Sequence, residues 1–509
     1  MRFFKKIGSR IVIVGLLIGI QILWFLGFMK YLTEYSVVIN LSLKLISVIA
    51  VLYLVSKREN PVNKLAWVIP ILCFPLLGGL MYILLYESKP SKHLQKKFQE
   101  SEERIKPLLT QDVNVRQKII KESKSVASQV AYLADTAGFP IYENTETTYY
   151  SSGEANFPDL LDAIKSAKHY IFLEYFIIEE GTMWNTILEV LKEKVESGVL
   201  VRVLYDDVGC LMTLPAHYDK ELRKMGIECM AFNPLVPFLK VTMNHRNHRK
   251  LTVIDGHTAF TGGINLADEY INAIHRYGYW KDAGIRIKGD AVWSLTAMFL
   301  TTWNGLKHSD ETFEKYMPTR FDTKKYQVKG FVQPYGDTPL DNETVGENVY
   351  LNMIHAALEY VYIFTPYLII DNEMVTALTL AAKRGVDVRI ITPSVSDSKM
   401  VFWLAESYYL ELMEGGVKVY YYMPGFLHSK CFVCDDMVAT VSSINMDFRS
   451  LYLHFENGVF LYNTDSVLEV KKDVIKALEE SKLLTKEELH RNWFLRLLRM
   501  ILRLFAPLL

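Results

Sequence analysis

A long internal duplication constrains the fold of this chain more than any other feature. A His-x-Lys-x4-Asp motif begins at His248, and Gly-Gly-Ile-Asn follows it at residues 262–265. The same motif begins again 180 residues later at His428 and is followed by Ser-Ser-Ile-Asn at residues 442–445. Self-similarity at a fixed offset indicates two copies of one structural unit. We therefore expect two halves that share one layout.

Each half has the strand, helix, strand order of an α/β unit. The apolar runs Tyr170–Ile178 and Val199–Tyr205 enclose a helical stretch in the first half, and Tyr360–Ile370 and Val386–Ile391 do so in the second. Alternating strands and helices predict a sheet with helices on its faces. The predicted fold class is α/β, with two pseudo-symmetric half-domains of β-sheets flanked by helices behind an N-terminal transmembrane helical region.

The 509 residues leave room for several structural units. The predicted units are an N-terminal membrane region at 1–90, a helical linker at 91–135, a first half at 136–330, a second half at 331–485 and an amphipathic interfacial helix at 486–509.

Three apolar stretches near the N-terminus predict a multi-pass protein of the cell membrane. They are Ile11–Met29, Val37–Val55 and Leu65–Tyr86, and each approaches the ~20 residues that a membrane-spanning helix needs. A cleaved signal peptide fits poorly, because no small-residue cleavage site follows the first stretch. Basic residues flank the stretches on both sides, so the membrane face of the catalytic part and the number of spans, two or three, stay open.

Two further segments carry apolar side chains suited to lipid. In Arg491–Leu504 the arginines share one helical face and the leucines and isoleucine the other, which predicts a basic interfacial helix. The alternative is a helix docked on the protein core. The insertion Leu235–Asn244 is either a lipid-facing loop or an ordinary packed loop.

The duplicated motifs supply the groups that a phosphodiester transfer needs. The candidate catalytic residues are His248, Lys250, Asp255, His428, Lys430 and Asp435. At the two-residue period of a strand, each histidine shares a face with its lysine, whereas the aspartates have the opposite parity and are expected to brace the loop. One imidazole can attack phosphorus while the other protonates the leaving alcohol, and the lysines neutralise the phosphate oxygens.

A second set of residues is expected to bind phosphate or to support the histidines. It comprises Asn265, Asn445, Gly263, Ser443, Asp282 and Glu456. A catalytic histidine needs an acceptor for its second ring nitrogen. Asp282 and Glu456 follow their histidines by 34 and 28 residues and are the candidates; otherwise they are surface carboxylates. His245, His257 and His454 have no repeat partner and are interpreted as ordinary polar or structural residues.

Composition excludes several other classes of site. The formal net charge is +0, so the charge gives no sign of a nucleic-acid partner. Five scattered cysteines form no disulfide framework. Cys431 and Cys434 form a C-x-x-C sequence, but they sit in an apolar strand-like run and are expected to be buried hydrophobic side chains. We expect no cofactor and no metal.

At these motifs the chain resembles the phospholipase D superfamily and, within it, the bacterial cardiolipin synthases. The similar segments are Arg-Glu-Asn-Pro at 58–61, Asn-His-Arg-Lys at 247–250, Thr-Pro-Tyr at 365–367 and Pro-Leu-Leu at 507–509. The resemblance implies a pseudo-twofold pair of α/β halves with phosphatidylglycerol as substrate. One departure is Ser-Ser at 442–443, where many relatives have Gly-Ser; it is tolerable if that strand end needs no positive φ.

The resemblance implies that two phosphatidylglycerols give cardiolipin and glycerol through a phosphohistidine, with His248 as nucleophile and His428 as acid and then base. Hydrolysis of phospholipids at the same site is the main alternative. A phosphodiesterase or nuclease, and a catalytically silent lipid-binding scaffold, are less favoured by the membrane segments and the intact motifs. The bilayer is the expected partner, and a homo-oligomer stays open.

Overall fold

The computed structural model describes residues 37–57, 60–73, 92–235, 244–307, 312–320, 324–341, 343–490 and 493–504, with Ala506 and a few single positions between 19 and 82. The predictions made for most of Ile11–Met29, for most of Leu65–Tyr86 beyond Cys73 and for most of Leu235–Asn244 fall outside these residues.

The first half forms a seven-stranded mixed sheet. Its strands are β1 (Thr145–Tyr150), β2 (Tyr170–Tyr175), β3 (Leu200–Asp206), β4 (Glu228–Phe232), β5 (Lys250–Ile254), β6 (Thr258–Gly262) and β8 (Gly284–Gly289). They lie in the order β1-β8-β6-β5-β2-β3-β4. Strands β2, β3 and β4 are parallel to one another, and the remaining neighbours pair antiparallel.

The second half repeats this arrangement in an eight-stranded sheet. Its strands are β9 (Phe331–Asp337), β10 (Tyr360–Phe364), β12 (Asp387–Pro393), β13 (Lys418–Tyr422), β15 (Cys431–Cys434), β16 (Val438–Ser442), β18 (Glu456–Tyr462) and β19 (Ser481–Leu483), in the order β19-β13-β12-β10-β15-β16-β18-β9. The hairpin β15-β16 occupies the place that β5-β6 holds in the first sheet. The duplication predicted from the sequence is therefore confirmed.

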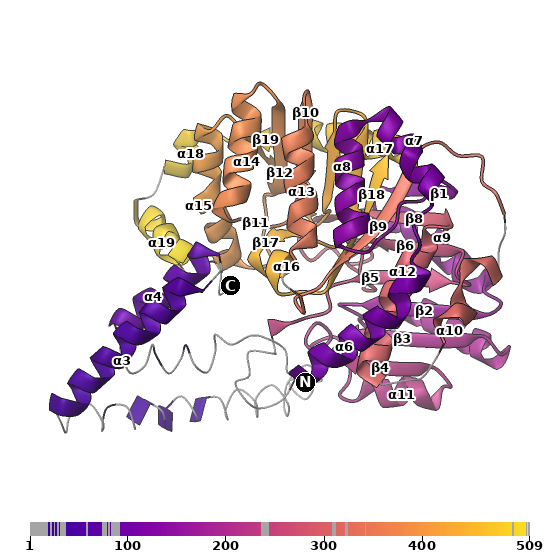
Figure 1. Cartoon of the computed structure of the whole chain (residues 1–509), viewed down its shortest axis with the longest axis horizontal. Helices are drawn as coiled ribbons and strands as arrows, with labels where there is room; N and C mark the ends of the chain where they lie inside the picture. The colour runs from indigo at the N-terminus through magenta and orange to yellow at the C-terminus, as the bar shows by residue number, and fades with distance from the viewer. Residues whose placement is uncertain are drawn as a thin grey trace.

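Helices cover the sheets, as the α/β prediction requires (Figure 1). The first half contains α9 (Gly153–Ser166), α10 (Thr182–Glu196), α11 (Tyr218–Lys224) and α12 (Val292–Lys307), and the second contains α13 (Val345–Ala356), α14 (Asn372–Lys383), α15 (Lys399–Glu414), α16 (Phe448–Tyr452), α17 (Asp465–Glu479) and α18 (Lys486–His490). Side chains cap the N-termini of two of these helices. The Ser152 hydroxyl accepts from the Ala155 N–H at α9, and the Asp371 carboxylate accepts from the Met374 N–H at α14. Helix α12 is apolar nearly all round and is correspondingly buried.

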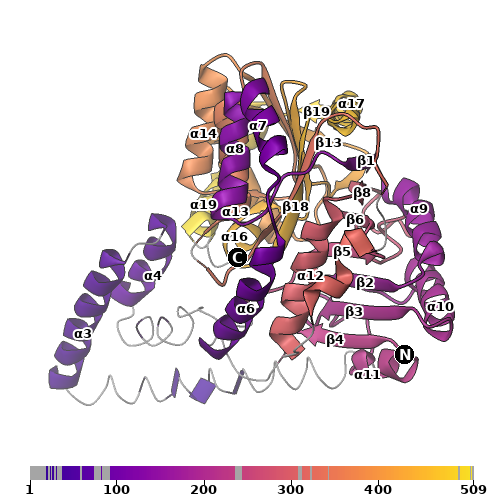
Figure 2. The ribbon, with the colours of Figure 1, turned by 45° about the vertical axis from the view of Figure 1, so that its right-hand side comes forward.

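The two halves join through short strands and a common core. Strand β7 (Tyr279–Lys281) of the first half pairs in parallel with β14 (Gly425–Leu427) of the second. The symmetric contact is a parallel bridge between Asn247 and Phe455. One hydrophobic cluster contains Phe172 and Val253 together with Phe364 and Val433. Figure 2 shows the strands of the two halves next to each other, with β18 close to β6. A small sheet of β11 (Leu368–Ile369) and β17 (Met446–Asp447) lies nearby in the second half.

The N-terminal helices extend away from the α/β body. They are α3 (Val37–Ser56) and α4 (Pro61–Cys73) (Figures 1 and 2). Helix α3 exposes large apolar side chains, among them Leu41, Leu45 and Leu52. Among the described residues, no helix has both the length and the hydropathy that crossing a membrane requires. Helices α6 (Lys92–Ile105), α7 (Val113–Glu122) and α8 (Lys124–Ala131) then lead into the first sheet.

The C-terminal helix α19 (Trp493–Leu504) docks on α15 by its arginine face. Arg499 donates to Glu406 and Arg503 to Glu411, both on α15. The apolar side chains Leu497, Met500 and Ile501 remain exposed. The helix is amphipathic as predicted, but its basic face contacts protein.

Candidate active site

The two histidines lie where the halves exchange backbone hydrogen bonds. The His248 N–H donates to the Phe455 carbonyl at 2.9 Å, and the His428 N–H donates to the Lys281 carbonyl at 2.7 Å. Phe455 directly precedes Glu456, and Lys281 directly precedes Asp282. Each histidine is thus placed beside the carboxylate of the other half.

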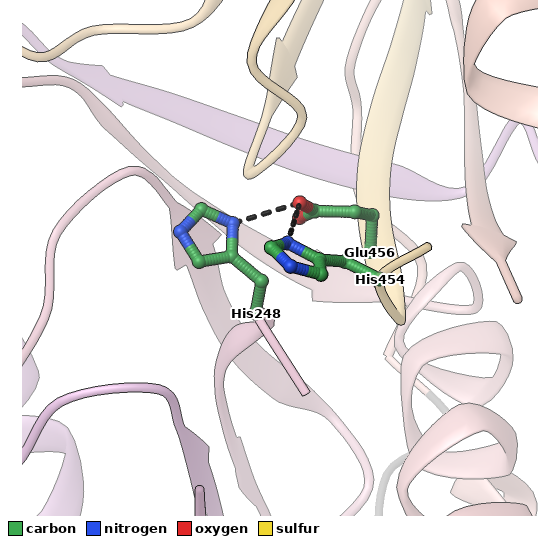
Figure 3. A group of neighbouring side chains, drawn as sticks. All are labelled: His248, His454 and Glu456. Carbon is green, nitrogen blue, oxygen red and sulfur yellow. Dashed lines mark hydrogen bonds and ion pairs between the residues drawn. The ribbon is translucent and has the colours of Figure 1, made fainter. Parts of the chain in front are cut away.

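The histidine and carboxylate pairs are consequently crossed between the halves. His248 Nδ1 lies 2.8 Å from Glu456 Oε1 (Figure 3). His428 Nδ1 lies 2.6 Å from Asp282 Oδ2. Both carboxylates are 0% exposed, so they are not surface groups. Because a carboxylate accepts hydrogen bonds, each pair sets Nδ1 as the protonated nitrogen and leaves Nε2 free.

The two lysines lie at the same buried place. Lys250 Nζ donates to the His248 carbonyl and Lys430 Nζ to the His428 carbonyl. Lys430 Nζ also lies 2.8 Å from His428 Nδ1. Burial lowers the pKa of Lys250 to about 7 and that of Lys430 to about 8. Two ammonium groups in one desolvated site favour an anionic ligand.

Burial and nearby positive charge lower the pKa of both histidines. Burial holds the pKa of His248 well below its usual range, and the charges of Lys250 and Lys430 lower it further. A charge on His428 acts on His248 in the same direction. Burial also lowers the pKa of His428 to about 4, with Lys430 adding to the effect and Asp282 opposing it. Both imidazoles are therefore neutral in the unliganded site.

The carboxylate on the His428 side stays ionised. Burial by itself would raise the pKa of Asp282, but the charges of His428 and Lys430 with the hydrogen bonds that it accepts keep this pKa below its usual value. One of those bonds comes from the Ala283 N–H to Oδ1 at 2.8 Å.

Gly263 and Ser443 occupy equivalent positions in the repeat. They differ in how they contact the neighbouring carboxylates, Asp282 and Glu456. A Cβ at Gly263 would lie 2.0 Å from Asp282 Oδ1, so only glycine allows this approach. The Ser443 hydroxyl instead donates to Glu456 Oε2. Ser442 and Ser443 are not among the non-glycine residues with positive φ, which satisfies the condition set for the departure from Gly-Ser.

The motif asparagines are buried near the histidines but make different contacts. Asn265 Oδ1 accepts from the Ile177 N–H at 3.0 Å, and its amide donates to the Tyr270 hydroxyl at 2.7 Å. Asn445 is 5% exposed, and its Oδ1 has no hydrogen-bond partner. Of the two motif asparagines, Asn445 is therefore the one whose side-chain oxygen accepts no hydrogen bond.

The motif aspartates do not join this cluster. Asp255 accepts from the backbone N–H groups of Lys168, His169 and Tyr170 at 2.7–2.8 Å. Asp435 accepts from those of Leu358, Glu359 and Tyr360 at 2.7–2.9 Å. Both have positive φ. The structure thus places them in turns, bracing the start of the adjacent strand, and gives them no contact with the histidines.

The surroundings of the two histidines differ. Near His428 lie the rings of Trp280, Tyr270 and Phe426, with centroids at 5.2, 5.5 and 5.8 Å. His454 occupies the position equivalent to Trp280, and its ring centroid is 5.6 Å from that of His248. His454 lacks a repeat partner and is not a predicted site residue; its place two residues before Glu456 is the signal that the sequence offers.

Two buried acids that the motif analysis missed hold the segment before His248. Asp206 accepts from the Asn247 N–H at 3.0 Å and lies 3.4 Å from the Arg246 guanidinium. Glu174 accepts from the Asn247 amide. They lie far upstream in the sequence, and only the fold brings them to the motif.

Cys431 and Cys434 are buried in β15 and free of disulfides, as expected. The one group of metal-ligating side chains among the described residues is His248, His454 and Glu456.

Comparisons with known proteins agree with this geometry. Residues 160–278 and 350–478 match the family model described as cardiolipin synthase, PLD-like domain, and residues 45–85 match the model described as phospholipase D-nuclease N-terminal. A cardiolipin synthase of Alkalihalophilus pseudofirmus is 35% identical, with 93% of each chain covered. One of Geobacillus kaustophilus is 32% identical over the full length of both chains. A Streptococcus mutans protein named "Uncharacterized protein" is 43% identical over 90% of this chain and 99% of its own.

Among solved structures, a phosphatidylserine synthase of Haemophilus influenzae superposes with a TM-score of 0.56 at 14% identity, covering 76% of this chain and 100% of its own. This likeness concerns the fold alone.

Proposed function

Because the chain belongs to the cardiolipin synthase family of phospholipase D-like proteins, we propose that it transfers a phosphatidyl group from one phosphatidylglycerol to another, giving cardiolipin and glycerol. The observation that carries the proposal is the buried site in which two crossed histidine and carboxylate pairs meet two lysines. We infer that one phosphodiester is held between the two Nε2 atoms and the two ammonium groups, while the carboxylates hold the histidines through Nδ1.

In the first step, His248 acts as the nucleophile. Its Nδ1–H donates to Glu456, so the Nε2 lone pair attacks phosphorus and forms a P–N bond. The P–O bond to glycerol breaks, and His428 donates a proton to the departing oxygen. The anionic phosphodiester raises the pKa of His428 on binding, because it brings negative charge beside the imidazole. Lys250 and Lys430 stabilise the charge on the non-bridging oxygens.

In the second step, the glycerol hydroxyl of another phosphatidylglycerol takes the place of the departed glycerol. His428, now neutral, accepts the hydroxyl proton, and the oxygen attacks phosphorus while the P–N bond to His248 breaks. Asp282 stabilises the imidazolium that forms in this step. The bond energy is retained in the phosphohistidine, so no nucleotide is consumed.

The expected location is the cell membrane, with a multi-pass N-terminal region. The exposed apolar side chains of α3 support this part of the proposal, and so do Leu497, Met500 and Ile501 on α19. A bilayer also concentrates the acceptor lipid, and positioning strongly favours an oriented nucleophile over water.

Labelled phosphatidylglycerol in mixed micelles with the purified full chain tests the proposal. We expect cardiolipin and free glycerol in equal amounts. Phosphatidic acid as the sole product would show a hydrolase instead. The variants His248→Asn and His428→Asn should both lose activity; full activity in either would contradict the shared site.

A further inference from the structure

A third histidine completes a group of ligating side chains on the His248 side. Figure 3 shows the rings of His248 and His454 next to the Glu456 carboxylate. Glu456 Oε1 is 2.8 Å from His248 Nδ1 and 3.8 Å from His454 Nδ1. One ligand atom from each of the three side chains lies within 4.8 Å of the others.

His454 has unused binding capacity. Its side chain is 9% exposed, and neither ring nitrogen has a hydrogen-bond partner. The 3.8 Å separation from Glu456 is too long for a hydrogen bond. Buried polar atoms are nearly always paired in folded proteins, so an unpaired pair of ring nitrogens facing a carboxylate points to a ligand.

We propose that His248, His454 and Glu456 form a binding site for a divalent transition-metal ion of the Zn²⁺ class. Two imidazoles and one carboxylate are a ligand set that Zn²⁺ prefers, with bonds of about 2.0–2.1 Å. Donor atoms around such an ion lie about 3.3 Å apart. This distance falls between the 2.8 Å from Glu456 Oε1 to His248 Nδ1 and the 3.8 Å from Glu456 Oε1 to His454 Nδ1. The Ser443 hydroxyl, bonded to Glu456 Oε2, leaves Oε1 for the metal.

The site would bind metal reversibly and with modest affinity. Lys250 and Lys430 place positive charge beside it, and that charge opposes a cation just as it favours a phosphate. The metal and the substrate phosphate therefore compete. Metal at His248 Nδ1 would require the single N–H proton of this neutral imidazole to move from Nδ1 to Nε2, which removes the lone pair that attacks phosphorus. Inhibition follows from this exchange, and this consequence rests on the proposed function.

Binding of Co²⁺, a spectroscopic substitute for Zn²⁺, tests the site without relying on activity. The full chain in detergent micelles should bind one Co²⁺ with the visible absorption of a tetrahedral N,O site, and Zn²⁺ should displace it. Mg²⁺, which prefers oxygen ligands, should not. His454→Asn and His454→Phe should each weaken binding at least about ten-fold, while His257→Asn, at the far turn of the β5-β6 hairpin, should bind as the wild type does. Absence of the absorption, or its persistence in both His454 variants, would overturn the proposal.

Cardiolipin formation gives the second readout. Zn²⁺ should inhibit the wild type, and a chelator should restore its activity. In the His454 variants the inhibitory concentration should rise at least about ten-fold. If Co²⁺ binds but cardiolipin formation is not inhibited, the result would support the metal site and would contradict the role of His248 as the nucleophile.

Discussion

Replacing Asp282 by asparagine should reduce activity far more than replacing Glu456 by glutamine, although each change removes one buried carboxylate beside a histidine. Asp282 Oδ1 accepts from the Ala283 N–H and Oδ2 from His428 Nδ1. In an asparagine the oxygen must stay with the backbone N–H, so the NH₂ group turns to His428. Lys430 Nζ, also a donor, already lies 2.8 Å from that nitrogen. His428 would then hold its proton on Nε2 and could not be stabilised as a cation.

Glu456 can tolerate the corresponding change. Its Oε2 is bonded by the Ser443 hydroxyl, which can accept as well as donate because it can turn toward the Asn457 carbonyl at 3.1 Å. The amide of a glutamine can therefore face Ser443, and its oxygen stays with His248 Nδ1. The tautomer of His248 is kept, and only the carboxylate charge is lost.

The two losses differ in size for this reason. A hydrogen bond to a charged group contributes about 1.5–3 kcal/mol, so Glu456→Gln should lower kcat by about 10- to 150-fold. Asp282→Asn should lower kcat by about 10³- to 10⁴-fold, because the group that orients a catalytic histidine changes from a hydrogen-bond acceptor to a donor. Initial rates of cardiolipin formation in mixed micelles measure both. Thermal unfolding should show that each variant is folded, and Asp162→Asn, at an exposed position of α9, is the control. Equal losses, or a larger loss for Glu456→Gln, would refute the assignment of donors and acceptors.

Three further outcomes are expected. The free enzyme loses the Lys250 and Lys430 charges as the pH rises through about 7 and 8. We therefore expect kcat/KM for phosphatidylglycerol to fall over that range. Below pH 7 both lysines are charged and do not limit kcat/KM. Asp435→Asn should lower the free energy of unfolding by about 1–3 kcal/mol, since one oxygen replaces a carboxylate that accepts three backbone N–H groups; a normal melting temperature with lost activity would speak for a catalytic role instead. Ile501→Glu on the exposed face of α19 should reduce binding to phosphatidylglycerol vesicles in a flotation assay, whereas Leu468→Glu, at an exposed position of α17, should not.

The sequence predicted the halves because a duplication repeats both its apolar runs and its motifs. The two-residue period of a strand predicted that each histidine shares a face with its lysine, but the histidines lie just before β5 and β15. It could not show which carboxylate meets which histidine, since a two-residue period assigns a face but not a partner across the interface. The parallel pairing of β7 with β14, and the bridge from Asn247 to Phe455, decide that.

The C-terminal helix shows a similar limit. Its amphipathic pattern is visible in the sequence, but the pattern does not say which face meets protein. The carboxylates of Glu406 and Glu411 on α15 bind the arginines. Two glutamates five residues apart on a distant helix are common in any sequence, so they carried no signal before the fold was known.

The crossed pairs also explain why the copies could diverge without losing the site. Each half contributes a histidine to one pair and a carboxylate to the other, so neither half holds a complete pair. The charged groups are kept in both copies, whereas the groups that support the carboxylates differ: Gly263 against Ser443, and Trp280 against His454. Asp282 is held by a backbone N–H and lies among aromatic rings, and Glu456 is held by a hydroxyl beside a second imidazole. In the proposed reaction one histidine bonds to phosphorus and the other carries a proton. The different groups around Asp282 and Glu456 would then fit the two histidines to these two roles.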